Sequence, residues 1–262
     1  MYSPEQLRSI REEELETVLR HLPPPGASIL EIGGGTGFQA RRLADRGYEV
    51  ASIDVVPSEP DSTETFPVTG YDGREIPFAD RSFDVIFSSN VLEHIEEPIL
   101  IHRECRRVLK PGGYCVHVVP TAAWRFWTSA GYHTDLAQRV VRIAMNHLPP
   151  RKARLAAADA IPGSRPRGIR ARSPVEILRR LLLPSPHGAR GNALSELRTF
   201  SVHSWQRHFL ENGMEILAVE PLRLFYTGHM LLGRRWSLAS RRKASEFLGS
   251  ACVLFKVRYR VQ

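Results

Sequence analysis

The sequence predicts an α/β fold built on a doubly wound, mostly parallel sheet, and two observations lead to this expectation. Apolar strand-like segments alternate with helix-like segments over residues 1–120, which is the pattern of a parallel sheet. The strand-like segment 29–33 ends in a glycine-rich turn that opens a helix-like segment at 38–46. In open parallel sheets ligands bind at the carboxyl ends of the strands, so this turn marks a binding site.

The expected elements follow in a regular order. The chain opens with an amphipathic helix whose apolar stripe is Leu7, Ile10, Leu15, Val18 and Leu22. Strands are expected at 29–33, 49–54, 68–71, 83–89 and 113–119, with helices at 38–46 and 98–109. Beyond Pro120 come an insertion with helical pieces, a helix at 202–212 opened by Ser201, and the strand-like segments "MEILAVEPLR" and "ACVLFKVRYR". Between those two strands lies the helix-like "RRWSLASRRKASEFL".

The glycine turn has the form acid-x-G-x-G-x-G, with Glu31, Gly33, Gly35 and Gly37. The dinucleotide fingerprint G-x-G-x-x-G would require glycine or alanine at position 38, where the chain has Phe38. A nicotinamide-dependent oxidoreductase is therefore a poor interpretation of this turn.

This turn resembles motif I of the class I S-adenosylmethionine-dependent methyltransferases. Three later segments extend the resemblance over roughly residues 28–120, in the family's order: "VASIDVVP", "YDGREIPFADRSFDVIFSSNVLEHIEEP" and "RECRRVLKPGGYCVHVVP". The last two are similar to the type 11 subgroup. The resemblance implies a Rossmann-like methyltransferase fold with seven strands, the last antiparallel, and helices on both faces, here carrying an inserted basic cap.

The resemblance also implies S-adenosyl-L-methionine as cofactor and assigns its binding residues. Glu31 and the loop from Gly33 through Gly35 to Gly37 would hold the methionine portion, and Asp54 would bind the ribose. Asp72 with Gly73 would lie beside the adenine, and Asn90 would begin the loop on the sulfonium side. Each of these residues also has a structural alternative.

Glu31 could merely orient the loop, and Asp54 could cap its strand. Asp72 and Gly73 form a common turn dipeptide, and Asn90 could cap the helix that follows.

Candidate catalytic and acceptor-side residues come from three segments. His94 follows the strand at 83–89, and His133 with Asp135 could form a base and its orienting carboxylate. Helix capping or core packing are the alternatives for all candidates. The acceptor-side candidates, which could equally be core aromatics, are Trp124, Trp127, Tyr132, Tyr226 and His229.

Composition also indicates which metal sites, disulfides and membrane spans to expect. The three cysteines, Cys105, Cys115 and Cys252, have no metal-ligand spacing and form an odd set, so neither a metal site nor a disulfide framework is expected. No apolar stretch approaches the roughly 20 residues of a membrane span. We therefore expect a cytoplasmic protein, soluble or peripherally bound at the inner membrane surface.

Charge divides the chain unevenly. Residues 1–138 carry 13 basic and 21 acidic side chains, a net −8, whereas residues 139–198 carry 13 and 3, a net +10. Three regions are expected: a cofactor-binding core at 1–120, a basic cap at 121–200 and a completion of the sheet at 201–262. The basic segment could be a solvated, mobile cover, or could bind an anionic acceptor or a membrane surface. Nucleic acid is the least favoured partner because no recognition motif accompanies the charge.

Two hypotheses of function remain. The first is an S-adenosylmethionine-dependent methyltransferase that acts, by in-line displacement, on an oxygen of a small-molecule, saccharide or lipid-linked acceptor. The saccharide or lipid acceptor rests on a resemblance of "ELRTFSVHSWQRHFLENGMEI…FYTGH" to methyltransferases of bacterial surface-polysaccharide and glycolipid pathways. The second is a catalytically inactive protein that binds the cofactor and acts as a regulator or scaffold.

Overall fold

One seven-stranded sheet forms the centre of the molecule, with the strand order β3-β2-β1-β4-β5-β7-β6. The computed structural model describes residues 4–55, 66–132, 186–189, 191–228 and 236–260. Strands β1 to β5 run parallel, and β7 is antiparallel to both of its neighbours, β5 and β6. The strands are β1 (Ser28–Ile32), β2 (Glu49–Asp54), β3 (Thr69–Gly70), β4 (Phe83–Ser89), β5 (Leu109–Pro120), β6 (Met214–Pro221) and β7 (Cys252–Tyr259).

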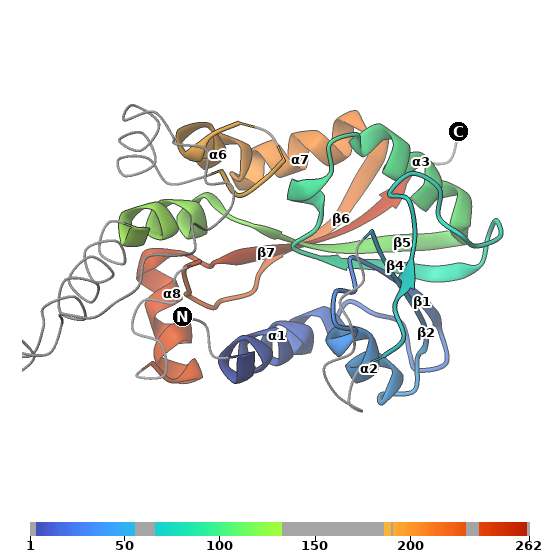
Figure 1. Cartoon of the computed structure of the whole chain (residues 1–262), viewed down its shortest axis with the longest axis horizontal. Coiled ribbons are helices and arrows are strands. Elements are labelled where there is room, and N and C mark those ends of the chain that lie inside the picture. The colour runs from blue at the N-terminus through green and yellow to red at the C-terminus, as the bar shows by residue number, and fades with distance from the viewer. Residues whose placement is uncertain (1–3, 56–65, 133–185, 190, 229–235, 261–262) are drawn as a thin grey trace, which may run out of the picture.

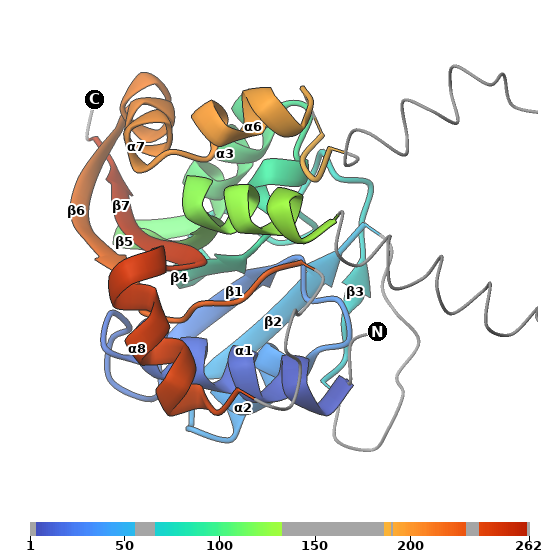
Figure 2. The same ribbon diagram turned by 90° about the vertical axis from the view of Figure 1, so that its left-hand side faces the viewer.

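Helices cover both faces of this sheet. Figures 1 and 2 show α1, α2 and α8 on one face and α3, α6 and α7 on the other. The helices are α1 (Pro4–Leu19), α2 (Phe38–Ala44), α3 (Pro98–Val108), α6 (Ala193–Thr199), α7 (Val202–Glu211) and α8 (Leu238–Leu248), with the short 3-10 helix η1 (Leu92–His94) after β4. Residues 122–132 are also helical. The doubly wound α/β fold with an antiparallel last strand is confirmed.

The central strands β1 and β4 are mostly apolar and largely buried, because helices cover both faces of the sheet. All five residues of β1 are buried, and Ile86 and Phe87 of β4 are fully inaccessible to solvent. In β7, Leu254 and Phe255 are equally buried. The core therefore runs through the middle of the sheet, and the glycine turn follows the carboxyl end of β1.

The expected boundaries agree with the structure to within a few residues. The strand expected at 113–119 begins earlier, at Leu109, and the one expected at 68–71 contains only Thr69 and Gly70. Ser201 caps α7, as expected, because its side chain accepts a hydrogen bond from the Ser204 N–H.

The amphipathic first helix packs on the core through part of its predicted stripe. Ile10, Leu15 and Val18 are buried, whereas Leu7 is 36% exposed and Leu22 follows the helix end. The three cysteines are free and buried. Among the described residues, no helix is long and apolar enough to cross a membrane.

Candidate cofactor and acceptor site

The glycine turn between β1 and α2 adopts a backbone that favours glycine. Gly33, Gly35 and Gly37 have positive φ angles of 79°, 54° and 76°. A Cβ on Gly33 would lie 2.2 Å from Val91 Cγ2, and one on Gly37 would lie 2.2 Å from the Phe66 carbonyl oxygen. Both positions therefore need glycine for conformation and for space.

Asp54, at the carboxyl end of β2, fastens this turn. Its Oδ2 accepts a hydrogen bond from the Gly35 N–H at 2.8 Å. The Gly33 and Gly34 N–H groups donate to the Ile53 carbonyl at 2.8 and 3.1 Å. The turn is thus held against the end of the neighbouring strand.

A cleft of about 580 Å³ opens beside this turn, at the carboxyl ends of β1, β2 and β4. Six of the residues expected from the sequence to bind cofactor or act in catalysis line it: Gly33, Asp54, Asp72, Gly73, Asn90 and His94. Its volume falls in the range typical of small-molecule sites.

One carboxylate oxygen of Asp72 is hydrogen-bonded within its own turn. Its Oδ1 accepts from the N–H groups of Arg74 and Glu75 at 2.8 and 2.9 Å, and these bonds hold the pKa of Asp72 below its usual range. The side chain nevertheless lines the cleft, so the turn interpretation and the adenine-side interpretation are compatible.

Glu31 lies beneath the turn and does not line the cleft. It is 2% exposed, and its Oε2 accepts a hydrogen bond from Ser52 Oγ at 2.7 Å. A Cβ on Gly34 would lie 3.0 Å from that same oxygen. Burial raises the pKa of Glu31 to about 7.

Asn90 connects the cleft to the first helix. It follows β4 with a positive φ of 55°, and its amide oxygen, oriented by its neighbours, accepts from Arg11 Nη1 at 2.6 Å. Arg11 also pairs with Glu14 at 2.6 Å, and Tyr226 donates to Glu14 at 2.7 Å. Tyr226 is buried in this network. It lines neither the cleft nor a second hollow of about 260 Å³ beside Glu93.

The remaining acceptor-side candidates are dispersed. Trp124 is buried with its ring 4.5 Å from that of His187, and Trp127 donates from Nε1 to the Leu248 carbonyl at 3.0 Å. Tyr132 is the last described residue of its helix, and it lines neither the cleft nor the hollow beside Glu93. His133, Asp135 and His229 lie outside the described residues.

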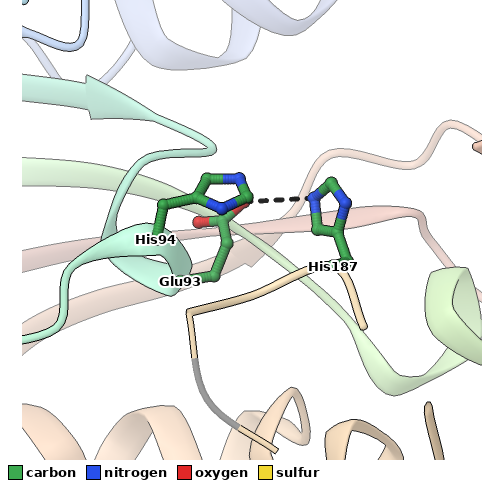
Figure 3. A group of neighbouring side chains, drawn as sticks. All are labelled: Glu93, His94 and His187. Atoms are coloured by element: carbon green, nitrogen blue, oxygen red, sulfur yellow. Dashed lines mark ion pairs between the residues drawn. The ribbon is translucent and has the colours of Figure 1, made fainter. Parts of the chain in front are cut away.

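A cluster of three side chains, Glu93, His94 and His187, lies at the end of the cleft (Figure 3). The Nε2 atoms of both histidines are 3.8 Å from Glu93 Oε1. Burial raises the pKa of Glu93 to about 7 and lowers that of His187 to about 4; the pKa of His94 is also lowered by burial. His94 therefore has a carboxylate neighbour in Glu93, which is adjacent to it in sequence.

Sequence reasoning missed Glu93 and His187. Glu93 directly precedes His94 in "VLEHIEEP", so an acid–histidine dipeptide was the available signal. His187 comes from the basic segment and reaches the cluster through tertiary structure, which no spacing in the sequence reveals.

A hollow of about 940 Å³ lies elsewhere, beside the start of β4 and the end of β7. Arginines dominate its lining, and several are paired, as in Arg107 with Asp80 and Arg258 with Glu215. It is larger than the cleft but contains none of the glycine turn. Ligands of parallel sheets bind at the carboxyl ends of the strands, so we place the site at the smaller cleft.

The family profile described as "Methyltransferase domain" matches residues 30–117. These residues contain the glycine turn, Asp54, Asp72, Asn90 and His94. Residues 30–117 are therefore similar to a methyltransferase domain, and this match supports a class I S-adenosylmethionine-dependent methyltransferase. The profile ends before the helix at 122–132, so it covers the cofactor side of the site and leaves the His187 side unmatched.

Relatives of the methyltransferase domain agree with this assignment. An uncharacterized methyltransferase from Mycobacterium sp. strain KMS is 39% identical over 97 residues, which cover 36% of this chain and 38% of the relative. A similar protein from Mycobacterium tuberculosis H37Rv is 39% identical over 102 residues, covering 36% and 39%. The match thus spans less than two fifths of either protein.

Solved structures extend the similarity of fold to nearly the whole chain. An S-adenosylmethionine-dependent methyltransferase from Mesorhizobium loti matches with a TM-score of 0.51 and 16% identity, covering 94% of this chain and 97% of that one. The [4+2]-cyclase SpnF matches with a TM-score of 0.50 and 16% identity, covering 95% and 82%. At this identity the likeness concerns the fold alone.

Proposed function

We propose that this chain transfers the methyl group of S-adenosyl-L-methionine to an oxygen of a small-molecule, saccharide or lipid-linked acceptor by in-line displacement. The observation that carries the proposal is the cleft of about 580 Å³ whose wall joins the Gly33 end of the glycine turn to Asp54 and Asn90. The Asp54–Gly35 hydrogen bond supports it, because it fixes the turn that the cofactor would contact.

The expected cofactor contacts follow the lining of the cleft. The turn at 33–37 would take the methionine portion, Asp54 the ribose hydroxyls and Asp72 with Gly73 the adenine side. Glu31 would act from beneath, through the shape and charge of the turn. Asn90, next to Val91 and His94 in the cleft wall, would face the sulfonium side.

Methyl transfer from a sulfonium depends mainly on positioning, because the cofactor already activates the methyl group. A hydroxyl acceptor adds the need for a group that takes a proton. His94 lines the cleft and lies 3.8 Å from the Glu93 carboxylate, and this proximity supports an oxygen acceptor.

The inactive cofactor-binding scaffold is not favoured by any feature of the described residues. The fold alone does not decide between the two, since it also serves a [4+2]-cyclase. We also propose that the basic segment 139–198, most of which lies outside the described residues, favours an anionic acceptor or a peripheral membrane position.

Two measurements test the proposal. Calorimetry should show that Asp54→Ala weakens S-adenosylmethionine binding by about 1 to 3 kcal/mol, because the ribose hydroxyls and the Gly35 N–H of the turn both lose their acceptor. Asp80→Ala, an exposed acidic residue outside the cleft, is the matched control. Unchanged affinity in Asp54→Ala would reject the ribose assignment.

The reaction itself is tested by mass spectrometry of metabolites from cells with and without the protein. A methylated product labelled from isotopic methionine is the expected result. Tight cofactor binding with no labelled product would instead support the scaffold.

A further inference from the structure

The Glu93–His94–His187 cluster contains a buried carboxylate that lacks a hydrogen-bond partner. The Glu93 side chain is 0% exposed, and neither of its oxygens has a hydrogen-bond partner among the described residues. Arg11, which lies on the same side, directs its hydrogen bonds to Glu14 and Asn90. A buried carboxylate without such partners is costly unless it takes up a proton or a cation compensates it.

Two imidazoles face this carboxylate from different parts of the chain. One ligand atom from each of the three residues lies within 4.8 Å of the other two. Figure 3 shows His94 next to the Glu93 carboxylate and His187 approaching both from another segment of the chain. His94 and His187 side chains are 47% and 36% exposed, so small rotations of the rings can bring them closer, while Glu93 stays fixed.

The backbone and a buried ion pair hold His187 in place. The Ala189 N–H donates to the Glu93 carbonyl at 2.8 Å, which ties the two segments together. The N–H groups of His187 and Gly188 both donate to Glu196 Oε1, and Glu196 pairs with Arg125 at 2.8 Å. These contacts fix the backbone of His187 beside Glu93.

We propose that Glu93, His94 and His187 bind a divalent transition-metal ion, with Zn²⁺ as the best match. Two histidines and one glutamate form a ligand set of zinc enzymes that leaves a fourth position open. Ligand atoms around tetrahedral zinc are about 3.3 Å apart, as follows from Zn–N and Zn–O lengths near 2.0 to 2.2 Å. The two 3.8 Å separations are close to this value.

The cluster lies at the boundary between two hollows. His94 lines the cofactor cleft, whereas Glu93 and Gly188 line a second hollow of about 260 Å³ that also contains Trp205 and His208. Ile95 lines both. An ion at this place would have a free coordination position near Ile95, where the cleft and the second hollow adjoin.

The role of the ion rests on the proposed function. It binds the acceptor oxygen and eases loss of the hydroxyl proton to water. The oxygen then bonds to the methyl carbon, and the electron pair of the broken carbon–sulfur bond stays on sulfur, which gives S-adenosylhomocysteine. An acceptor with a hydroxyl group that can reach the ion is the substrate class expected.

The experiment titrates Co²⁺ and Zn²⁺ into the metal-free, tag-free full chain without cofactor or acceptor. Visible absorption reports Co²⁺ coordination, and calorimetry reports Zn²⁺ binding. We expect one equivalent per chain and a loss of affinity of about tenfold or more in Glu93→Gln and in His187→Ala. His187→Cys should restore Zn²⁺ binding, because a thiolate is also a zinc ligand.

His203→Ala, which removes an exposed histidine from α7, should bind like the unaltered chain. Circular dichroism and S-adenosylmethionine binding check that each variant is folded. The proposal is overturned if no saturable binding is detected, or if Glu93→Gln or His187→Ala leaves the affinity unchanged. Because cofactor and acceptor are absent from the titration, its failure leaves the Asp54→Ala test of the proposed function standing.

Discussion

The two sides of the site are built in different ways. The cofactor side consists of backbone turns at the ends of neighbouring strands, with Gly33, Asp54 and Asn90 supplied by β1, β2 and β4 in chain order. The cluster side is assembled from side chains far apart in sequence. Glu93 lies next to His187, whose backbone is held by Glu196, and Glu196 is paired with Arg125. One side depends on local conformation, and the other depends on tertiary packing.

Neighbouring residues therefore specify the cofactor side, whereas the cluster side is specified only by the folded chain. A strand-end turn is specified by residues within about one motif, so it is shared among proteins with different acceptors. A side-chain cluster needs contacts across about 90 residues, as between Glu93 and His187.

The largest effect is expected at the buried ion pair of the cluster side. Glu196→Ala should lower the free energy of unfolding by about 3 to 5 kcal/mol, because it removes the carboxylate paired with Arg125 in a buried site. It also removes the acceptor of the His187 N–H. Urea denaturation measures the change.

Glu16→Ala provides the control for this substitution, because it breaks the exposed pair with Arg46. It should cost less than about 1 kcal/mol. Equal effects of the two substitutions would show that the pair under His187 is not a special support of the cluster side.

The next effect concerns the glycine turn. Gly37→Ala should destabilise the fold by about 2 to 4 kcal/mol, since it combines a strained positive φ with overpacking against the Phe66 backbone. Cofactor affinity should fall as well. Thermal denaturation and calorimetry measure the two changes.

Gly213→Ala isolates the backbone strain in that experiment. Gly213 has the same φ of 76°, but a Cβ there would meet nothing within 4 Å. It should cost about 1 to 2 kcal/mol and leave cofactor binding intact. If Gly37→Ala were no worse than this control, the close approach of Phe66 would carry no energetic weight.

A pH dependence is expected from Glu31. Its pKa is near 7 in the folded chain and 4.5 in the reference state, so folding takes up a proton between these values. The stability associated with this group is fully present below pH 4.5 and is lost as the pH rises through 7. Between pH 5 and 8 the loss should amount to about 2 to 3 kcal/mol.

Glu31→Gln removes this titration and keeps an acceptor for Ser52. Its stability relative to the unaltered chain should therefore rise with pH, as followed by urea denaturation in buffers from pH 5 to 8. A stability difference that stays constant over this range would mean that Glu31 titrates normally beneath the turn.

The smallest effect is expected where the first helix meets the site. Tyr226→Phe should cost about 1 to 2 kcal/mol, because it leaves an oxygen of buried Glu14 without its hydroxyl donor. Tyr48→Phe, which removes a hydrogen bond to the Pro23 carbonyl, should cost less because the acceptor lies in a half-buried region. Reversal of this order, measured by thermal denaturation, would argue against the network that joins α1 to Asn90.

Most of the fold could be predicted from the sequence because its signals are local. The mostly apolar β1 and β4, the glycine turn and the Ser201 cap each occupy a few consecutive residues. The predicted ends of two strands were less accurate. β3 contains only Thr69 and Gly70, and β5 starts at Leu109, since strand ends depend on the pairing partner.

The candidate site could be predicted only on its cofactor side. Gly33, Asp54 and Asn90, to which the resemblance gives cofactor contacts, line one cleft. Glu31 lies below it, which sequence could not show because depth beneath a turn is a property of packing. Trp127 and Tyr226 are engaged in hydrogen bonds away from the cleft lining, and the role of His187 depends on a fold contact with Glu93.

The place of β7 has a consequence for biosynthesis. This strand is made last, yet it lies between β5 and β6, and β6 joins the sheet through it. Until Cys252–Tyr259 leaves the ribosome, β5 presents an open edge, and open edges invite pairing with other chains. A nascent chain halted before residue 252 would therefore contain the whole glycine turn. Its sheet would lack β7, and the exposed edge of β5 would be prone to association with other chains.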